Sequence, residues 1–259
     1  MTAMERVLIL GDIHANDAAL AAVLNDAADR YRGQPPRIWF LGDLFGRGPQ
    51  PARAYRRLMS QNPEALIAGN HEGGLIGRFR NARNGDIISG PYNKDDWEVL
   101  ERHRQELCAQ ELLQCDQDAI SGELFDFVSR LPVICSPRPA IYMVHGGLES
   151  AFAPPDDLSG FLDRLVWEYA NTPARAAFTL AAMQWVAAQQ PANARIVHTS
   201  DRRPAPELVL VGHWHARLLY DAAGAAWRYP PQLDTPYALG GRPVLLSPGS
   251  VGFPRQNGE

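Results

Sequence analysis

Short apolar runs alternate with apolar residues at helical spacing along the first part of the chain. Runs at residues 7–10 and 38–41 each end in Gly-Asp, and a third run at about 66–68 ends in Gly-Asn. Between them, apolar positions recurring every three to four residues predict helices over about 16–31 and 51–60. Strand–helix–strand units of about 30 residues are typical of a parallel sheet. The pattern therefore predicts an α/β fold.

The remainder of the chain has a less regular pattern. Residues 73–96 are rich in Gly and Asn and predict a loop, followed by two amphipathic helices that end near residues 112 and 131. Two more helices are predicted within 158–190. Short strands are predicted at 132–137, 141–144, 208–211, 217–220, 225–229 and 244–246, the last three as antiparallel β structure. With no internal repeat and no domain boundary in the pattern, we expect one domain over 1–259, with a helical insertion at about 73–135.

Composition narrows the class of protein. The net charge is −4 without a run of like charges, which argues against general nucleic-acid binding or membrane-surface binding. No apolar segment reaches the ~20 residues that a membrane helix needs, and no signal peptide is evident, so a cytoplasmic protein is expected. The cysteines Cys108, Cys115 and Cys135 lack ligand-like spacing and are expected to be reduced, inert thiols.

Potential metal ligands gather where the predicted strands end. Each of five blocks places Asp, Asn or His beside Gly, and together they hold five of the seven histidines. The blocks are Gly11-Asp12-Ile13-His14, Gly42-Asp43, Gly69-Asn70-His71-Glu72, His145-Gly146-Gly147 and Gly212-His213-Trp214-His215. An α/β protein builds a site from the carboxyl ends of its strands, so this arrangement predicts a metal centre.

The residue types indicate which metals would bind. Asp12 and His14 are separated by one residue, and an extended strand end would direct both side chains to one side. The two oxygens of Asp43 allow it to bridge two ions. Mixed nitrogen and oxygen ligation favours Mn, Fe or Zn, and no thiolate ligand is implied.

Some of the blocks, taken alone, have a plain structural explanation. Gly-Asp after a strand is a common turn, and a histidine before two glycines is a weak signal. Gly-Asn-His-Glu has no evident structural use, and Gly-His-x-His places two imidazoles on one face. The five blocks together, each at a strand end, favour a metal site over a purely structural origin.

This ordered set of motifs resembles the calcineurin-like metallophosphoesterase superfamily. The resemblance implies a β-sandwich of two sheets flanked by helices, with a dinuclear centre between the sheets. It implies one ion held by Asp12, His14, Asp43 and His215, and a second held by Asp43, Asn70, His145 and His213. The expected cofactors are two divalent transition-metal ions, with Mn the first choice for activity assays and Fe or Zn as alternatives.

The resemblance also implies roles in catalysis. Hydrolysis of a phosphate ester needs a nucleophile, charge neutralisation and protonation of the leaving group, and paired metals supply the first two. Asp43 would keep the ions together. His71 would not bind metal but would lie beside the leaving group, which an imidazole can protonate near neutral pH. Glu72 is a candidate to orient the His71 ring.

Arg47 bears on the type of substrate. It stands where the serine/threonine protein phosphatase branch has a phosphate-binding arginine, and a guanidinium suits a terminal phosphoryl group. We therefore favour a phosphomonoesterase acting on a phosphorylated small molecule, nucleotide or phosphoprotein.

Other features leave the type of reaction open. Gly212-His213-Trp214-His215 and the segment 247–252 resemble small bacterial phosphodiesterases, so a phosphodiesterase or nucleotide pyrophosphohydrolase is the alternative. A non-catalytic metal-binding scaffold is a remote alternative, because the full ligand set and His71 are present. The oligomeric state is not indicated.

Several further residues have plainer expectations. A solvated loop is predicted for Arg78, Arg80 and Arg83, with contact to an anionic substrate as the alternative. The charged stretch around His103 predicts a solvated helix face, His198 is expected to be structural and Trp214 is expected to pack. Asn16 and Asp17 are predicted to cap the first helix.

Overall fold

The computed structural model describes residues 5–32, 35–77, 94–116, 120–189, 193–200, 203–222, 226–228 and 242–254. The elements in chain order are β1 (Val7–Leu10), α1 (Asp17–Arg30), β2 (Arg37–Phe40), α2 (Pro51–Ser60), β3 (Ala65–Leu66), α3 (Asn70–Leu75), α4 (Lys94–Ala109), β4 (Gln114–Cys115), β5 (Ile120–Ser121), α5 (Glu123–Arg130), β6 (Ile134–Arg138), β7 (Ile141–Val144), α6 (Leu158–Trp167), α7 (Pro173–Ala188), β8 (Ile196–His198), β9 (Leu208–Val211), β10 (Arg217–Asp221), β11 (Ala226–Arg228) and β12 (Val244–Pro248). They fall into two compact units: an N-terminal unit of Met1–Leu131 with Val251–Phe253, and a C-terminal unit of Pro132–Ser250 with Pro254–Glu259.

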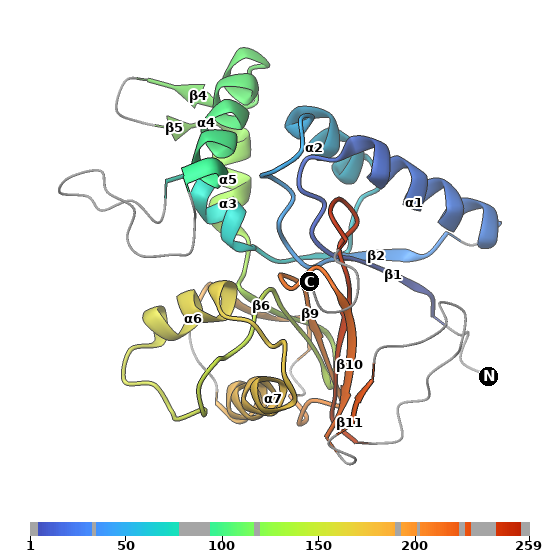
Figure 1. Cartoon of the computed structure of the whole chain (residues 1–259), viewed down its shortest axis with the longest axis vertical. Helices are drawn as coiled ribbons and strands as arrows, with labels where there is room; N and C mark the ends of the chain where they lie inside the picture. Colours follow the sequence, from blue (N-terminus) through green and yellow to red (C-terminus); the bar gives the residue numbers. More distant parts are fainter. Residues whose placement is uncertain are drawn as a thin grey trace. The chain divides into compact units, whose positions relative to one another are not determined.

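The N-terminal unit is built on a parallel sheet in the order β1-β2-β3. Figure 1 shows α1 and α2 together on one side of β1 and β2. The Asn16 side chain caps α1 by accepting a hydrogen bond from the Ala19 amide at 3.1 Å, as the sequence predicts. Asp17 instead binds Arg57 of α2 through two hydrogen bonds of 2.5 and 3.0 Å, and these bonds lower the pKa of Asp17. This ion pair fastens the first helix to the second.

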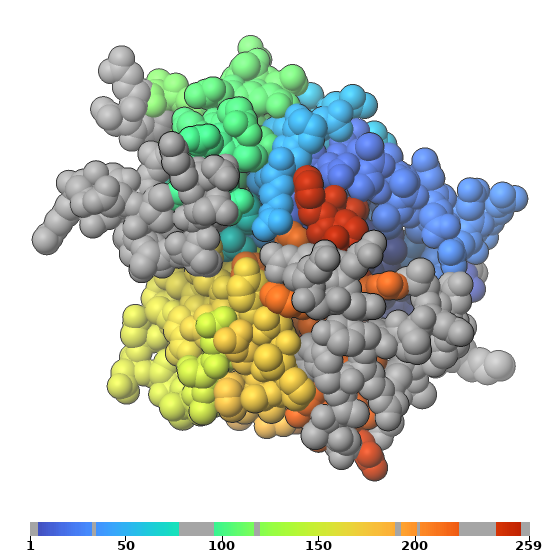
Figure 2. All heavy atoms as spheres, viewed as in Figure 1, coloured from blue at the N-terminus to red at the C-terminus, as the bar shows by residue number. Residues whose placement is uncertain are grey.

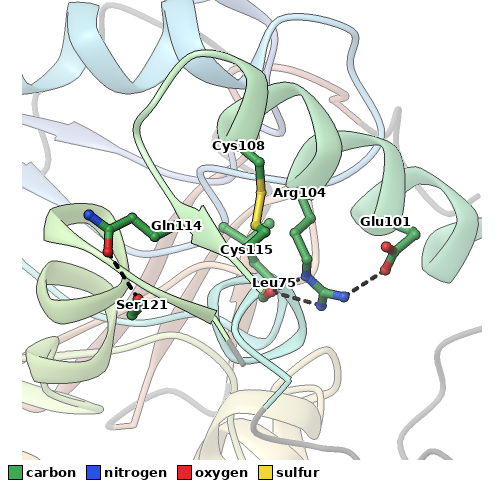
Figure 3. Close-up of a disulfide and its surroundings, with 7 residues drawn as sticks. All are labelled: Leu75, Glu101, Arg104, Cys108, Gln114, Cys115 and Ser121. Carbon is green, nitrogen blue, oxygen red and sulfur yellow. Dashed lines mark hydrogen bonds and ion pairs between the residues drawn. A yellow bond between two sulfur atoms is a disulfide. The ribbon is translucent and has the colours of Figure 1, made fainter. Parts of the chain in front are cut away.

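The segment that follows β3 adds three helices to the same unit. Helix α4 packs against α2 and α3, and buries Leu100 and Leu107. A disulfide joins Cys108 of α4 to Cys115 of β4, with 6.0 Å between the two Cα atoms (Figure 3). The prediction of reduced thiols is therefore wrong for this pair, because the turn after α4 brings the two cysteines together. Cys135 stays a free thiol, and burial raises its pKa to about 11.

The C-terminal unit contains a seven-stranded mixed sheet in the order β11-β10-β12-β9-β7-β6-β8. Strand β10 pairs antiparallel with β11 and β12, as expected. Strand β12 also pairs parallel with β9, a pairing that the sequence pattern did not indicate. Helices α6 and α7 bury Leu165 and Met183 among other apolar side chains. Both helices lie on one face of this sheet (Figure 1). The yellow atoms in Figure 2, which belong to this part of the chain, lie at the surface of the C-terminal unit. The predicted α/β class is confirmed.

The chain returns to the N-terminal unit near its last described residues. The Val251 amide donates to the Gly11 carbonyl at 3.1 Å, and the Gly252 amide donates to the Asp12 carbonyl at 3.0 Å. The Asn16 side chain donates to the Gly252 carbonyl at 3.0 Å. In Figure 2 this segment (red) lies among blue atoms of the N-terminal unit. The loop that follows β1 is therefore completed by residues more than two hundred positions away.

Two further expectations concern the loop after α3 and membrane-spanning helices. Arg78, Arg80 and Arg83 lie outside them, so the predicted solvated loop stays a prediction. Across the ranges that the structure describes, each helix is too short or too polar to cross a membrane.

Candidate metal centre

Three predicted ligands of the N-terminal unit lie close together. Asp12 and His14 follow β1, Asp43 follows β2, and all three side chains are buried. Their ligand atoms lie within 4.8 Å of one another. Two buried carboxylates at this separation repel each other unless a cation neutralises them. The chemistry of the cluster therefore fits a metal ion.

The backbone at these ligands is left-handed. The φ angles are 32° at Asp12, 49° at His14 and 61° at Asp43. Asp12 and His14 do lie together, as predicted, but an extended strand end is not the reason, because the chain turns sharply as soon as β1 ends. Non-glycine residues in this conformation carry strain of roughly 1–3 kcal/mol each, and such strain gathers at functional positions.

Glu72 holds the Asp43 turn and the residue before α3 in place. Its buried carboxylate accepts hydrogen bonds from the amides of Asp43 at 2.8 Å, Leu44 at 2.7 Å and Gly69 at 2.7 Å. A Cβ atom at Gly69 would lie 2.2 Å from Asp43 Oδ1, so this close approach requires glycine. These bonds run to the backbone rather than to the His71 ring that the sequence suggested. Glu72 therefore ties the end of β2 to the start of α3.

His71 lies beside the carboxylate of Asp43. Its amide donates to Asp43 Oδ1 at 3.0 Å, and its Nε2 atom lies 3.8 Å from Asp43 Oδ2. The rings of His71 and His14 meet edge to face with 4.7 Å between their centroids. Asn70, the residue before it, is also buried at the start of α3. The structure thus brings both residues of this motif to the Asp43 loop.

A hydrogen bond fixes the tautomer of His14. Its Nδ1 atom lies 2.8 Å from the Phe45 carbonyl oxygen, so Nδ1 carries the proton and donates. The lone pair is then on Nε2, which lies 3.7 Å from Asp43 Oδ2. A backbone carbonyl on the far nitrogen is how proteins orient a metal-binding imidazole.

The C-terminal unit contributes three buried histidines. His145 follows β7, while His213 and His215 follow β9 and have left-handed φ angles of 61° and 62°. The rings of His145 and His213 lie 5.0 Å apart, and their ligand atoms are within 4.8 Å.

His213 is oriented by its surroundings. Its Nε2 atom lies 2.9 Å from the Trp167 carbonyl oxygen, which leaves the Nδ1 lone pair for a metal. The ring stacks on Tyr169 with 4.4 Å between the centroids and 14° between the planes. Trp214 packs edge-on against the same tyrosine at 5.3 Å, in line with its expected packing role.

The loop after Asp43 presents Arg47 to solvent. Within the part of the chain that the structure describes, its guanidinium makes no hydrogen bond or ion pair. Arg47 has a left-handed φ of 59°, and Gly46 before it has a φ of 84°. A Cβ atom at Gly46 would lie 2.1 Å from His71 Nδ1, so the loop runs directly against the His71 ring.

His103 is buried, and the prediction of a solvated helix face is wrong for it. The Gly46 amide donates to its Nδ1 atom at 3.2 Å, and its Nε2 atom lies 2.6 Å from the Gly48 carbonyl oxygen. The residues on either side of it are charged and suggested solvent. However, Leu100, His103 and Leu107 recur at helical spacing, a signal that places His103 on the buried face of α4.

The strand-end clusters of Asp and His define a metal-binding α/β protein, and comparison identifies its family. The model of the calcineurin-like phosphoesterases matches residues 5–217. The chain belongs to this family of metal-dependent hydrolases of phosphate esters.

Solved structures share the fold. A metallophosphoesterase from Sphaerobacter thermophilus superposes with a TM-score of 0.62 at 23% identity, over 98% of this chain and 80% of that one. A hypothetical protein, PH1004, from Pyrococcus horikoshii OT3 gives 0.53 at 17% identity, over 97% and 79%. In sequence, the uncharacterized protein MJ0912 from Methanocaldococcus jannaschii is 35% identical over 72 residues, which are 28% of this chain and 28% of that protein.

Proposed function

We propose that the protein is a phosphomonoesterase that depends on two metal ions. The observation that supports the metal dependence most directly is the buried cluster of Asp12, His14 and Asp43, whose charge requires a cation. The ligand sets are those of the family resemblance. One ion is assigned to Asp12, His14, Asp43 and His215, and the other to Asp43, Asn70, His145 and His213.

The donor atoms fit divalent transition metals. Carboxylate oxygens, an amide oxygen and imidazole nitrogens suit Mn, Fe or Zn, and Mn is our choice for activity assays. When bound, such a pair of ions acidifies a water molecule and neutralises phosphoryl charge. The fixed tautomers of His14 and His213 support their assignment, because each ring keeps one lone pair for an ion.

We assign His71 as the acid that protonates the leaving oxygen. His71 is buried beside Asp43. The hydrogen bond from its backbone amide to that carboxylate holds it at the edge of the ligand cluster. An imidazole with no metal bond can exchange a proton near neutral pH.

Arg47 supports the choice of a monoester over a diester. Its exposed guanidinium is free of protein partners among the described residues, so it can form two parallel hydrogen bonds to a terminal phosphoryl group. A diester offers one fewer charged oxygen for that contact. The substrate class is accordingly a phosphorylated small molecule, nucleotide or phosphoprotein.

A paired turnover assay tests the proposal. Protein stripped of metal and reloaded with Mn²⁺ is assayed on an aryl phosphomonoester and on the matching diester. We expect a preference for the monoester, and we expect Arg47→Ala to lower monoester kcat/KM about 10- to 100-fold, because a charged hydrogen-bond pair is lost. Diester turnover should fall much less. The matched control is Arg32→Ala, which removes an exposed arginine elsewhere on the unit.

The alternatives give different results. A preference for the diester would replace the phosphomonoesterase by a phosphodiesterase or nucleotide pyrophosphohydrolase. Equal losses on both esters would remove Arg47 from its assigned role. Full metal occupancy without turnover of any phosphate ester would indicate a non-catalytic scaffold.

A further inference from the structure

We propose that His103 of helix α4 is a positioning residue that holds Arg47 in place to bind the phosphoryl group. This inference rests on the proposed function, because the substrate contact of Arg47 belongs to that proposal. It adds a residue from a part of the chain that matches none of the ligand motifs.

The geometry around Arg47 is a two-point clamp. One ring nitrogen of His103 accepts a hydrogen bond from the amide before Arg47, and the other lies 2.6 Å from the carbonyl of the residue after it. Gly46 and Gly48 flank Arg47, and two glycines give a loop many accessible conformations. A single buried ring that binds both glycines selects one of these conformations.

The opposite side of the loop is held by the β1 turn. The Gly48 amide donates to the His14 carbonyl at 2.9 Å, and His14 Nδ1 donates to the Phe45 carbonyl at 2.8 Å. The Arg47 loop therefore lies between a predicted metal ligand and α4. Its position relative to the His14 turn depends on both contacts.

The protonation state of His103 suits this task. Burial lowers its pKa to about 4, with smaller contributions from His71 and Arg102, so the ring is neutral at pH 7. A neutral ring that accepts at Nδ1 carries its proton on Nε2 and donates it to the Gly48 carbonyl. Both hydrogen bonds are thus satisfied by one tautomer.

The neighbouring residue makes a parallel contact. The Arg104 guanidinium donates to the Leu75 carbonyl at 2.9 and 3.1 Å, and pairs with Glu101 (Figure 3). Leu75 is the last residue of α3, the helix that begins with Asn70 and His71. Consecutive residues of α4 therefore hold the Arg47 loop and the helix that carries His71.

A set of variants separates positioning from simple packing. His103→Phe keeps a flat ring but removes both hydrogen bonds. His103→Gln restores a donor and an acceptor about as far apart as the two ring nitrogens. Leu107→Ala is the matched control, because it removes buried volume from the same helix and leaves the clamp in place.

The first measurement is independent of turnover. Hydrogen exchange of a peptide covering residues 44–50 should be at least tenfold faster in His103→Phe than in the wild type, because the Gly46 amide loses its acceptor. In His103→Gln and Leu107→Ala the rate should stay within about threefold of the wild type. An unchanged exchange rate in His103→Phe would overturn the clamp.

The second measurement is a double-mutant cycle on monoester turnover. His103→Phe should lower kcat/KM about 10- to 100-fold in the wild type, because small displacements of a binding group have effects of this size. It should change kcat/KM less than about twofold in Arg47→Ala, since the residue through which it acts is already absent. His103→Gln should recover most of the loss.

The outcomes distinguish the two proposals. Equal losses in both backgrounds would overturn positioning through Arg47. A wild type that turns over no phosphate ester would contradict the proposed function. In that case, fast exchange in His103→Phe would still establish the clamp as a property of the loop.

Discussion

The two units hold their predicted ligands by different means. In the N-terminal unit, buried side chains bind the backbone of the ligand loops: Glu72 accepts from three amides, His14 donates to Phe45, and His103 binds both sides of Arg47. In the C-terminal unit, His213 is held by one carbonyl and by stacking on Tyr169. In the N-terminal unit these side chains join several loops. In the C-terminal unit the loops are joined through the backbone, as from the Gly212 amide to the His145 carbonyl at 2.8 Å, and the side-chain contact of Tyr169 orients one ring.

This difference leads to different expectations for mutation. A change to one member of the N-terminal network should disturb several ligands and reduce the stability of the unit. A change beside His213 should lower the affinity for one of the two ions and leave the fold intact.

Glu72→Gln should lower the free energy of unfolding by about 3–5 kcal/mol. The amide side chain removes a buried charge and presents a donor where backbone amides need an acceptor. Urea unfolding of the metal-free protein measures the change. The exposed Glu111→Gln serves as the control and should stay within about 0.5 kcal/mol. A loss below about 1 kcal/mol would show that Glu72 does not organise the loops.

His103 should make stability depend on pH. Its folded pKa of about 4 lies below the unfolded value of 6.5, so the unfolded chain binds more protons between these values. Its contribution to the free energy of unfolding is complete above about pH 6.5 and declines as the pH falls toward about 4, by roughly 3 kcal/mol in total. The difference between wild-type and His103→Phe unfolding curves over this range isolates the effect. Parallel curves would contradict a buried neutral ring.

Tyr169→Leu should affect metal binding more than stability. Loss of the stacked ring is expected to cost about 1 kcal/mol in unfolding free energy. The affinity for one of the two ions should fall about 10- to 100-fold, as for other residues that orient a ligand. Metal titration by calorimetry would then show two sites of clearly different affinity. Equal weakening of both sites would remove the contrast between the units.

Local pattern was enough to predict several elements of the N-terminal unit. The strand at 7–10 and the helix at 51–60 match β1 and α2, because apolar periodicity and the proline at the start of α2 are local signals. The residues that follow each strand were identified for a related reason: Gly beside Asp or His at a strand end is visible in the sequence.

The contacts that hold those residues were not visible. His103 and Glu72 act through the backbone of loops far from them in the chain, and a backbone amide has no sequence signature. The left-handed turns at Asp12 and Asp43 are likewise set by distant hydrogen bonds. The same holds for the disulfide, since the spacing of Cys108 and Cys115 carries no information about the turn between them.

The return of Val251 and Gly252 to the β1 turn bears on the order of events during synthesis. The carbonyls of Gly11 and Asp12 find their partners only after residues 251 and 252 have been made. A nascent chain that ends before residue 251 contains β1, Asp12 and His14. It lacks Val251 and Gly252, whose amides bind the turn after β1. Completion of the N-terminal ligand loop therefore waits for residues that are made more than two hundred positions after the loop itself.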